Sequence, residues 1–121
     1  MNETEAGKQA LEVLLVDDDE DTRSLLVDLL HERGLDTHAC STGEEALALL
    51  RGQHFDAMIT DQVMPGITGL ELVQRARSVD ASLRCVVLSG SPAPSGADVT
   101  WVRKPVSIGV LVAALSPRPT P

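Results

Sequence analysis

Acidic side chains follow directly after two short apolar runs of the sequence. Asp17 and Asp18 come after one run, and Asp61 comes after another. Two later runs end in Ser89 and in Lys104. If the runs are parallel strands of one sheet, these groups all lie at the carboxyl edge of that sheet, where open α/β folds build their sites. Carboxylates, a hydroxyl and a lysine at one edge are suited to hold a divalent cation beside a phosphoryl group.

Three carboxylates brought close together repel one another. Two unit charges roughly 4 Å apart repel by about 4 kcal/mol at an effective dielectric constant near 20. Such a site takes up protons or binds a cation, and oxygen ligands with no adjacent His or Cys favour Mg²⁺ or Mn²⁺. A carboxylate beside that ion can attack phosphorus and form an aspartyl phosphate. Lys104 can then pair with one phosphoryl oxygen, and the Ser89 hydroxyl can donate a hydrogen bond to another.

The composition indicates one domain with an aliphatic core. The 121 residues are 43% hydrophobic but only 2% aromatic, and one domain of this size can bury a sizeable core. The net charge is −8, and no stretch is rich in Lys or Arg, which argues against nucleic-acid binding. No apolar run is long enough to span a membrane, and the first residues lack the pattern of a signal sequence. We therefore expect a soluble, cytoplasmic protein.

The cysteines and histidines show no metal-ligand spacing. Cys40 and Cys85 fall in or beside apolar segments, so we interpret them as reduced core thiols rather than a disulfide or a redox switch. The histidines, His31, His38 and His54, are scattered, and we expect them at the surface or at helix ends.

Apolar runs alternate with helical patterns along the chain. Five strands are predicted, at residues 13–16, 36–40, 57–61, 83–88 and 99–103. The first helix is predicted to end at Gly34 and to carry one apolar stripe, made of Leu25, Leu26, Leu29 and Leu30. Strands that alternate with helices favour a parallel sheet covered on both faces, an α/β fold.

Capping residues mark where the other helices begin. Asp19 is interpreted as a helix cap, and Ser107 can cap a last helix that runs to Leu115. Residues 41–44 and 68–71 both match the capping-box pattern, which makes Glu44 and Glu71 capping partners rather than catalysts.

The interval between the fourth and fifth strands departs from the alternation. Residues 90–98 contain two prolines, two glycines and two serines, so no helix is expected there. Nine extended residues still reach about 30 Å, which exceeds the roughly 17 Å of a five-residue strand. A loop without a helix can therefore make this crossover.

Four segments together resemble the response-regulator receiver domain of two-component signalling. They are residues 16–23, residues 61–69, Leu88-Ser89-Gly90 and Lys104-Pro105. Each motif alone is weak, but all four in this order are highly specific, and the resemblance covers residues 13 to about 115. It implies a flavodoxin-like, doubly wound sheet of order 2-1-3-4-5, in which the fourth helix is short or absent.

The resemblance also implies roles for the acidic residues. Asp61 would be the phosphoacceptor, which receives a phosphoryl group from a histidine kinase or a histidine phosphotransfer protein. Asp17 and Asp18 match the acidic pair that binds Mg²⁺ together with Asp61, and the backbone carbonyl of Val63 would complete the protein ligands. A receiver of this kind is not an enzyme in the usual sense, because it catalyses only its own phosphorylation and dephosphorylation.

The remaining matched residues would sense the phosphoryl group. Ser89 matches the switch hydroxyl, Lys104 the family's lysine, and Trp101 the switch aromatic. The family commonly has Tyr or Phe at the last position, and the bulk of Trp101 argues against inward rotation. In this family the Lys104–Pro105 peptide is typically cis.

The absence of a helix between the fourth and fifth predicted strands also bears on the domain organisation that we expect. A shortened interval resembles the terminal receivers of hybrid sensor kinases, but the Met1 start favours a separate chain, and we expect no attached effector domain. We expect a flexible segment at residues 1–11, a receiver domain at residues 12–116 and a Pro-rich tail at residues 117–121. Without one wall of the usual dimer face, the domain is expected to be a monomer that passes its signal to an unidentified downstream protein.

Two other functions are compatible with parts of this pattern. A degenerate receiver would bind a protein partner without being phosphorylated, although the complete acidic set argues against this. A haloacid-dehalogenase-like phosphohydrolase would use Asp17 as its nucleophile, because residues 17–19 fit an Asp-x-Asp motif. Such enzymes also need a late acidic pair, where this chain has Ser89 and Gly90.

Overall fold

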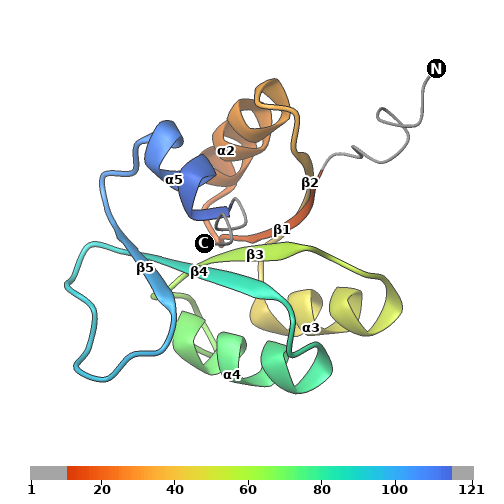
Figure 1. Cartoon of the computed structure of the whole chain (residues 1–121), viewed down its shortest axis with the longest axis vertical. Helices are drawn as coiled ribbons and strands as arrows, with labels where there is room; N and C mark the ends of the chain where they lie inside the picture. The colour runs from red at the N-terminus through yellow and green to blue at the C-terminus, as the bar shows by residue number, and fades with distance from the viewer. Residues whose placement is uncertain (1–10, 116–121) are drawn as a thin grey trace, which may run out of the picture.

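Five parallel strands form a single sheet at the centre of the molecule. The structure, a computed structural model, describes residues 11–115, so the predicted tail and all but the last residue of the predicted flexible segment lie outside the described residues. The strand order is β2-β1-β3-β4-β5, as predicted (Figure 1). The strands span Glu12–Val16 (β1), Asp36–Cys40 (β2), Ala57–Asp61 (β3), Arg84–Ser89 (β4) and Thr100–Arg103 (β5).

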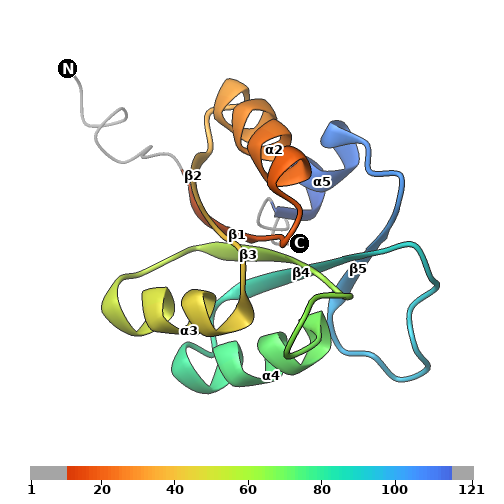
Figure 2. The same cartoon turned by 180° about the vertical axis from the view of Figure 1, so that it is seen from behind.

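Helices cover both faces of this sheet. They span Glu20–Glu32 (α2), Gly43–Gly52 (α3), Gly69–Val79 (α4) and Ile108–Leu115 (α5). The helices α2 and α5 lie on one face and α3 and α4 on the other, as Figure 1 and Figure 2 show from opposite sides. The architecture is therefore the doubly wound, flavodoxin-like α/β fold that the sequence predicts.

The sheet separates two hydrophobic cores. Successive side chains of a strand point to opposite faces, so Leu14 and Val16 of β1 pack with α3 and α4, while Val13 and Leu15 pack beneath α2 and α5. All four side chains are fully buried, as expected of a strand covered on both faces. Rigid, buried strands of this kind hold the residues at their carboxyl ends in fixed positions.

The predicted boundaries of α2 are confirmed, but its apolar stripe is narrower than expected. Asp19 is the N-cap and accepts a hydrogen bond from the Thr22 backbone N–H at 2.9 Å, and the helix ends before Gly34, which has a φ of 82°. Leu26 and Leu30 are buried, whereas Leu25 is 57% exposed. Leu25 does not face the core because one residue along a helix is a rotation of about 100°.

The capping box at α4 is confirmed, and the one at α3 is shifted by a residue. Thr68 and Glu71 bond reciprocally at the start of α4. In α3 the N-cap is Thr42, whose side chain accepts from the Glu45 N–H at 3.1 Å, so the prediction of Glu44 as the capping partner was wrong. Glu45 instead reaches back to the backbone and hydroxyl of the preceding Ser41.

No helix occurs between β4 and β5, where residues 90–99 form a described loop. The loop projects from the sheet beside β5 in Figure 1. Its Pro and Gly content predicts the absence of a helix. It contains one backbone hydrogen bond, from Ala97 N–H to the Pro94 carbonyl at 3.2 Å. The indole N–H of Trp101 anchors it from β5 by donating to the Ser91 carbonyl at 2.8 Å.

Both cysteines are buried free thiols, as predicted. Burial raises the pKa of Cys40 and of Cys85 to about 11, so neither forms a reactive thiolate readily at neutral pH.

None of the helices between residues 11 and 115 has the length and apolar character needed to cross a bilayer.

Candidate functional site

Three carboxylates meet at the carboxyl edge of the sheet. Strands β1 and β3 are parallel neighbours with Val16 opposite Thr60, so the next residues, Asp17 and Asp61, come side by side. One carboxylate oxygen from each of Asp17, Asp18 and Asp61 lies within 4.8 Å of the other two. Asp17 and Asp61 are buried, whereas Asp18 is exposed at the rim. The tertiary structure thus assembles the acidic set that the sequence predicts, and we call these three residues the acidic pocket.

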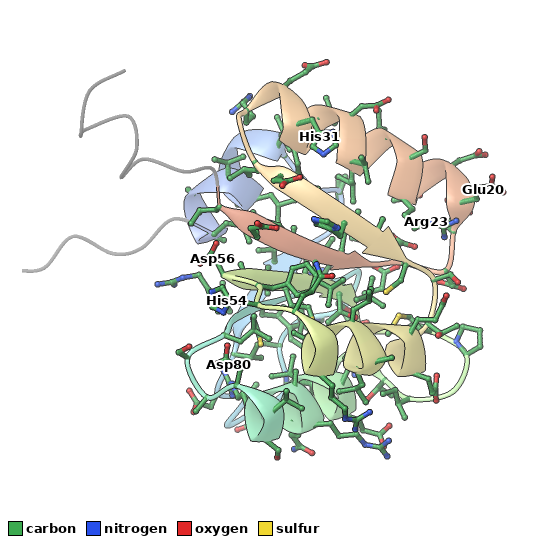
Figure 3. All side chains as sticks on the ribbon, turned by 90° about the vertical axis from the view of Figure 1, so that its right-hand side faces the viewer. Glu20, Arg23, His31, His54, Asp56 and Asp80 are labelled. Atoms are coloured by element: carbon green, nitrogen blue, oxygen red, sulfur yellow. The ribbon has the colours of Figure 1, made fainter. Side chains whose placement is uncertain are left out.

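Local hydrogen bonds orient Asp17 within the acidic pocket. One of its carboxylate oxygens accepts from the Asp19 backbone N–H at 2.9 Å, and its carbonyl accepts from Arg23 Nη1 at 2.8 Å. Figure 3 shows Arg23 near the start of α2, toward the carboxyl edge of the sheet. Burial raises the pKa of Asp17 to about 6, and the nearby charge of Asp61 adds to this effect despite the hydrogen bond from Asp19. The pocket therefore has a marked affinity for positive charge.

Lys104 supplies a positive charge next to Asp61. Its ammonium nitrogen lies 2.8 Å from Asp61 Oδ1 in an ion pair. The lysine is placed by its backbone N–H, which donates to the Ser89 carbonyl at 2.8 Å, and the Lys104–Pro105 peptide is cis as expected. Burial alone would lower the pKa of Lys104, but the ion pair with Asp61 and the charges of the other two acids raise it.

Ser89 ends β4 beside the acidic pocket, and it is linked to Trp101. The hydroxyl oxygen of Ser89 accepts a hydrogen bond from the Ser91 N–H at 3.0 Å, and the Ser91 carbonyl accepts the indole N–H of Trp101. Trp101 is partly buried and packs against the core on the α3 and α4 side. The side chain of Val63 is 82% exposed, so a role in the pocket would rest on its backbone carbonyl; that role remains a prediction.

Sequence reasoning missed the contact that positions the backbone of Asp61. Gly69 begins α4 so close to Asp61 that a Cβ on it would clash with the Asp61 carbonyl oxygen. Its N–H donates to the Gln62 carbonyl at 2.9 Å, and the Gln62 side-chain oxygen accepts from the Leu70 N–H at 2.9 Å. The glycine that follows the capping threonine was the available signal in the sequence, because only the absence of a Cβ permits this approach.

The donor set of the acidic pocket fits a hard divalent cation. It consists of carboxylate oxygens, two of them from buried residues whose charges repel, and no imidazole or thiol belongs to it. A small dication that prefers oxygen ligands matches both the chemistry and the charge of this set. A carboxylate close to both such an ion and an ammonium group is chemically suited to phosphoryl transfer.

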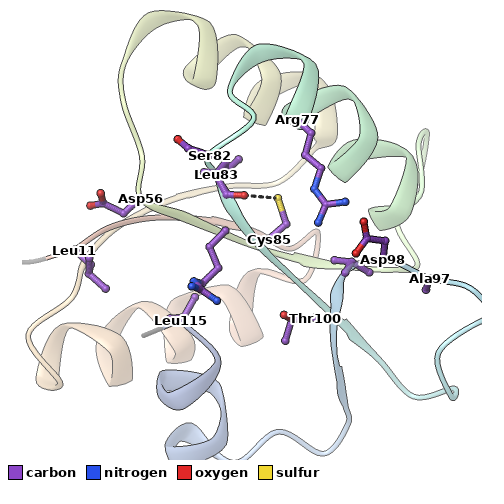
Figure 4. Close-up of a pocket in the computed structure, with 12 residues that line it drawn as sticks. Leu11, Asp56, Arg77, Ser82, Leu83, Cys85, Ala97, Asp98, Thr100 and Leu115 are labelled. Carbon is purple, nitrogen blue, oxygen red and sulfur yellow. Dashed lines mark hydrogen bonds between the residues drawn. The ribbon is translucent and has the colours of Figure 1, made fainter. Parts of the chain in front are cut away.

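A separate cavity of about 580 Å³ lies at the amino edge of the sheet (Figure 4). Arg77 from α4 and Asp98 from the loop before β5 line it, together with Cys85 of β4. None of the lining residues belongs to the acidic pocket, so this cavity takes no part in the chemistry described above.

Comparison with known proteins assigns the family. The model of the response regulator receiver domain family matches residues 13–115, and the chain therefore belongs to this family. It is 38% identical over 76 residues to a response regulator receiver protein of Anaeromyxobacter sp., covering 63% of this chain and 32% of that protein. It is 42% identical over 83 residues to the virulence sensor protein BvgS of Bordetella pertussis, covering 64% of this chain and 7% of that protein.

Among solved structures, the receiver domain of the hybrid histidine kinase CckA superposes with a TM-score of 0.75. The two are 31% identical, and the match covers 87% of this chain and 99% of that one. The chain spans less than a third of the length of the two curated relatives.

The close approach of Gly69 to Asp61 yields a prediction about stability. Gly69→Ala should destabilise the fold by about 1–3 kcal/mol, because the added methyl group displaces the backbone at the acidic pocket. Gly52→Ala is the matched control, since nothing lies within 4 Å of a Cβ at Gly52, which is the last residue of α3. Urea unfolding of both variants measures the difference, and an equal effect of the two substitutions would contradict this account.

Proposed function

We propose that this chain receives a phosphoryl group from the phosphohistidine of a histidine kinase or a histidine phosphotransfer protein onto Asp61. The observation that carries the proposal is the position of Asp61, buried at the carboxyl end of β3 beside two other carboxylates and 2.8 Å from the Lys104 ammonium. Membership of the receiver family supports the same role. The chain is a signalling component that catalyses only its own phosphorylation and dephosphorylation.

The transfer is an attack of carboxylate on phosphorus. A carboxylate oxygen of Asp61 forms the new P–O bond, the P–N bond to the donor imidazole breaks, and the nitrogen keeps the electron pair. Lys104 then pairs with a phosphoryl oxygen in place of the Asp61 oxygen. The Ser89 hydroxyl, at the end of the neighbouring strand, donates a hydrogen bond to another phosphoryl oxygen.

Asp17, Asp18 and Asp61, with the backbone carbonyl of Val63, would hold Mg²⁺ in this site. The bound ion supplies positive charge that offsets the repulsion between the carboxylates and the incoming phosphoryl group. Asp17 contributes one of the two buried carboxylates of this set, and its hydrogen bond from Asp19 keeps it oriented toward the pocket.

The proposal includes a cellular compartment and the kind of partner that the protein contacts. Buried free thiols at Cys40 and Cys85 suit a reducing compartment, and we place the protein in the cytoplasm. A further protein must read the phosphorylated state, and its contact surface lies outside the acidic pocket. Direct binding to nucleic acid is not part of the proposal, because the net charge is −8.

Phosphorylation by acetyl phosphate with Mg²⁺ tests the acceptor. The wild-type chain should gain one phosphate, and Asp61→Asn should lose the modification because the amide is a poor nucleophile. Asp98→Asn is the matched control, since Asp98 is exposed in the loop before β5. Intact-protein mass spectrometry measures the yield.

Three outcomes of this experiment would contradict the proposal. Full phosphorylation of Asp61→Asn would place the acceptor elsewhere. An unmodified wild-type chain would favour the degenerate receiver that only binds a partner. Repeated turnover that persists in Asp61→Asn and is lost when Asp17 is replaced would favour the phosphohydrolase.

Binding of Mg²⁺ should stabilise the fold in a pH-dependent way. An ion that binds only the native state adds about 1.4 kcal/mol at a tenfold excess over Kd. Since the pKa of Asp17 is raised to about 6, its proton competes with the metal, and affinity should fall about tenfold between pH 7 and pH 5. Without metal, this raised pKa makes the Asp17 contribution to stability decline as pH rises from about 4 to about 6.

Thermal melts at pH 7 and pH 5, with and without Mg²⁺, measure this effect. Asp18→Ala should remove most of the Mg²⁺-dependent gain, because it removes one of the three carboxylates proposed to hold the ion. Identical wild-type melts with and without saturating Mg²⁺ at pH 7 would refute metal binding.

We further propose that the activated domain stays monomeric. The loop at residues 90–99 replaces the helix that would form one wall of the usual dimer face, and exposed polar and small residues dominate it. Light scattering with and without beryllofluoride, a phosphoryl mimic, should give the mass of one chain in both states. A tight dimer that appears only with the mimic would refute this prediction.

A further inference from the structure

A second cluster of metal-binding side chains lies at the amino end of β1 and β2. The two strands pair in parallel with Glu12 opposite Asp36 and Leu14 opposite His38. Side chains of paired residues lie on the same face of a sheet, and so do those two positions apart. Glu12, Asp36 and His38 therefore converge on one face, although the sequence showed no ligand spacing among them.

The distances within this cluster match those around a bound metal ion. His38 Nε2 lies 3.4 Å from Glu12 Oε1 and 3.9 Å from Asp36 Oδ1. One ligand atom from each of the three residues lies within 4.8 Å of the other two. Two ligand atoms on a tetrahedral ion with bonds of about 2.0–2.1 Å are roughly 3.3 Å apart, so small side-chain rotations suffice to close the site.

The core holds the imidazole of His38 in this orientation. Its ring packs edge-on against Phe55, with ring centroids 5.5 Å apart and planes at 78°. Phe55 is 1% exposed and belongs to the core beneath α3, so it gives the imidazole a rigid support. The His38 side chain is itself 43% exposed, which leaves Nε2 accessible to an ion from solution.

The charges of the cluster favour a cation between the two strands. Like charges that face each other directly across neighbouring strands destabilise a sheet, and Glu12 and Asp36 are such a pair. Within residues 11–115, no lysine or arginine forms an ion pair with either carboxylate. The Glu12 backbone is meanwhile fixed by its N–H, which donates to Asp56 Oδ2 at 2.8 Å.

We propose that Glu12, Asp36 and His38 form a binding site for a transition-metal dication, with Zn²⁺ as the best-suited ion. One imidazole nitrogen and two carboxylate oxygens are ligands that Zn²⁺ accepts, and water completes a tetrahedral set. The acidic pocket, by contrast, contains only oxygen donors and suits Mg²⁺. The five residues of β1 separate the two sites by about 16 Å, so they share no ligand.

Zinc titration in saturating Mg²⁺ tests this site without reference to phosphorylation. The excess Mg²⁺ occupies the acidic pocket, and competition with a chromophoric chelator reports the Zn²⁺ affinity of the remaining site. The wild-type chain should bind one Zn²⁺, and the imidazole NMR signals of His38 should shift on binding. His38→Gln and Glu12→Gln should each weaken the affinity at least tenfold.

His54→Gln is the matched control for the loss of an exposed histidine. His54 also lies near carboxylates, 3.3 Å from Asp56 and 3.9 Å from Asp80, but among residues 11–115 it does not belong to a three-ligand cluster. This variant should bind Zn²⁺ as the wild type does. His38→Gln also removes the ring contact with Phe55, so this variant can fail to fold for a reason unrelated to metal binding. Glu12→Gln preserves the shape of the side chain and tests the site in that case.

Two results would overturn the inference. One is a wild-type chain that takes up no Zn²⁺ under these conditions. The other is a folded His38→Gln or Glu12→Gln variant with the affinity of the wild type, which would show that any bound Zn²⁺ is held elsewhere.

Discussion

Repulsion among carboxylates at one edge of the sheet is the constraint on which the rest of the structure depends. One carboxylate oxygen from each of the three residues lies within 4.8 Å of the other two, and repulsion is strongest between Asp17 and Asp61, which are shielded from water. The fold tolerates this because Lys104 lies against Asp61 and because the raised pKa of Asp17 lets a proton bind there at mildly acidic pH. Because the carboxylates repel one another when no positive charge is present, the site favours a bound cation. The same charges suit it to the transfer of a phosphoryl group.

The surrounding structure keeps these groups from moving apart. Strands β1, β3 and β4 are buried on both faces, so their carboxyl ends are held by two cores rather than by flexible loops. At the capped start of α4, Gly69 packs closely against the backbone of Asp61. The loop at residues 90–99 is linked to Ser89 through Ser91, and the same Ser91 joins this end of β4 to Trp101.

Strand β1 connects two groups of acidic residues with different chemistry. Its carboxyl end leads to Asp17 in a pocket of oxygen donors, and its amino end carries Glu12 beside an imidazole. Both follow from the same physical rule, since the register of parallel strands places side chains of distant residues next to one another. The first cluster fits the activity of the receiver family, and the second is independent of it.

The sequence by itself determined the order of elements, the acidic residues and the loop without a helix. These features depend on short-range patterns: apolar runs, capping residues, and Pro and Gly that prevent a helix at residues 90–98. Only the tertiary structure decided which leucines of α2 are buried, that Thr42 rather than Ser41 caps α3, and that Gly69 touches Asp61. The tertiary structure also determined the raised pKa of Asp17 and brought the side chain of His38 close to that of Glu12. Those properties depend on burial and on distances between residues far apart in the chain, which strand register and core packing set.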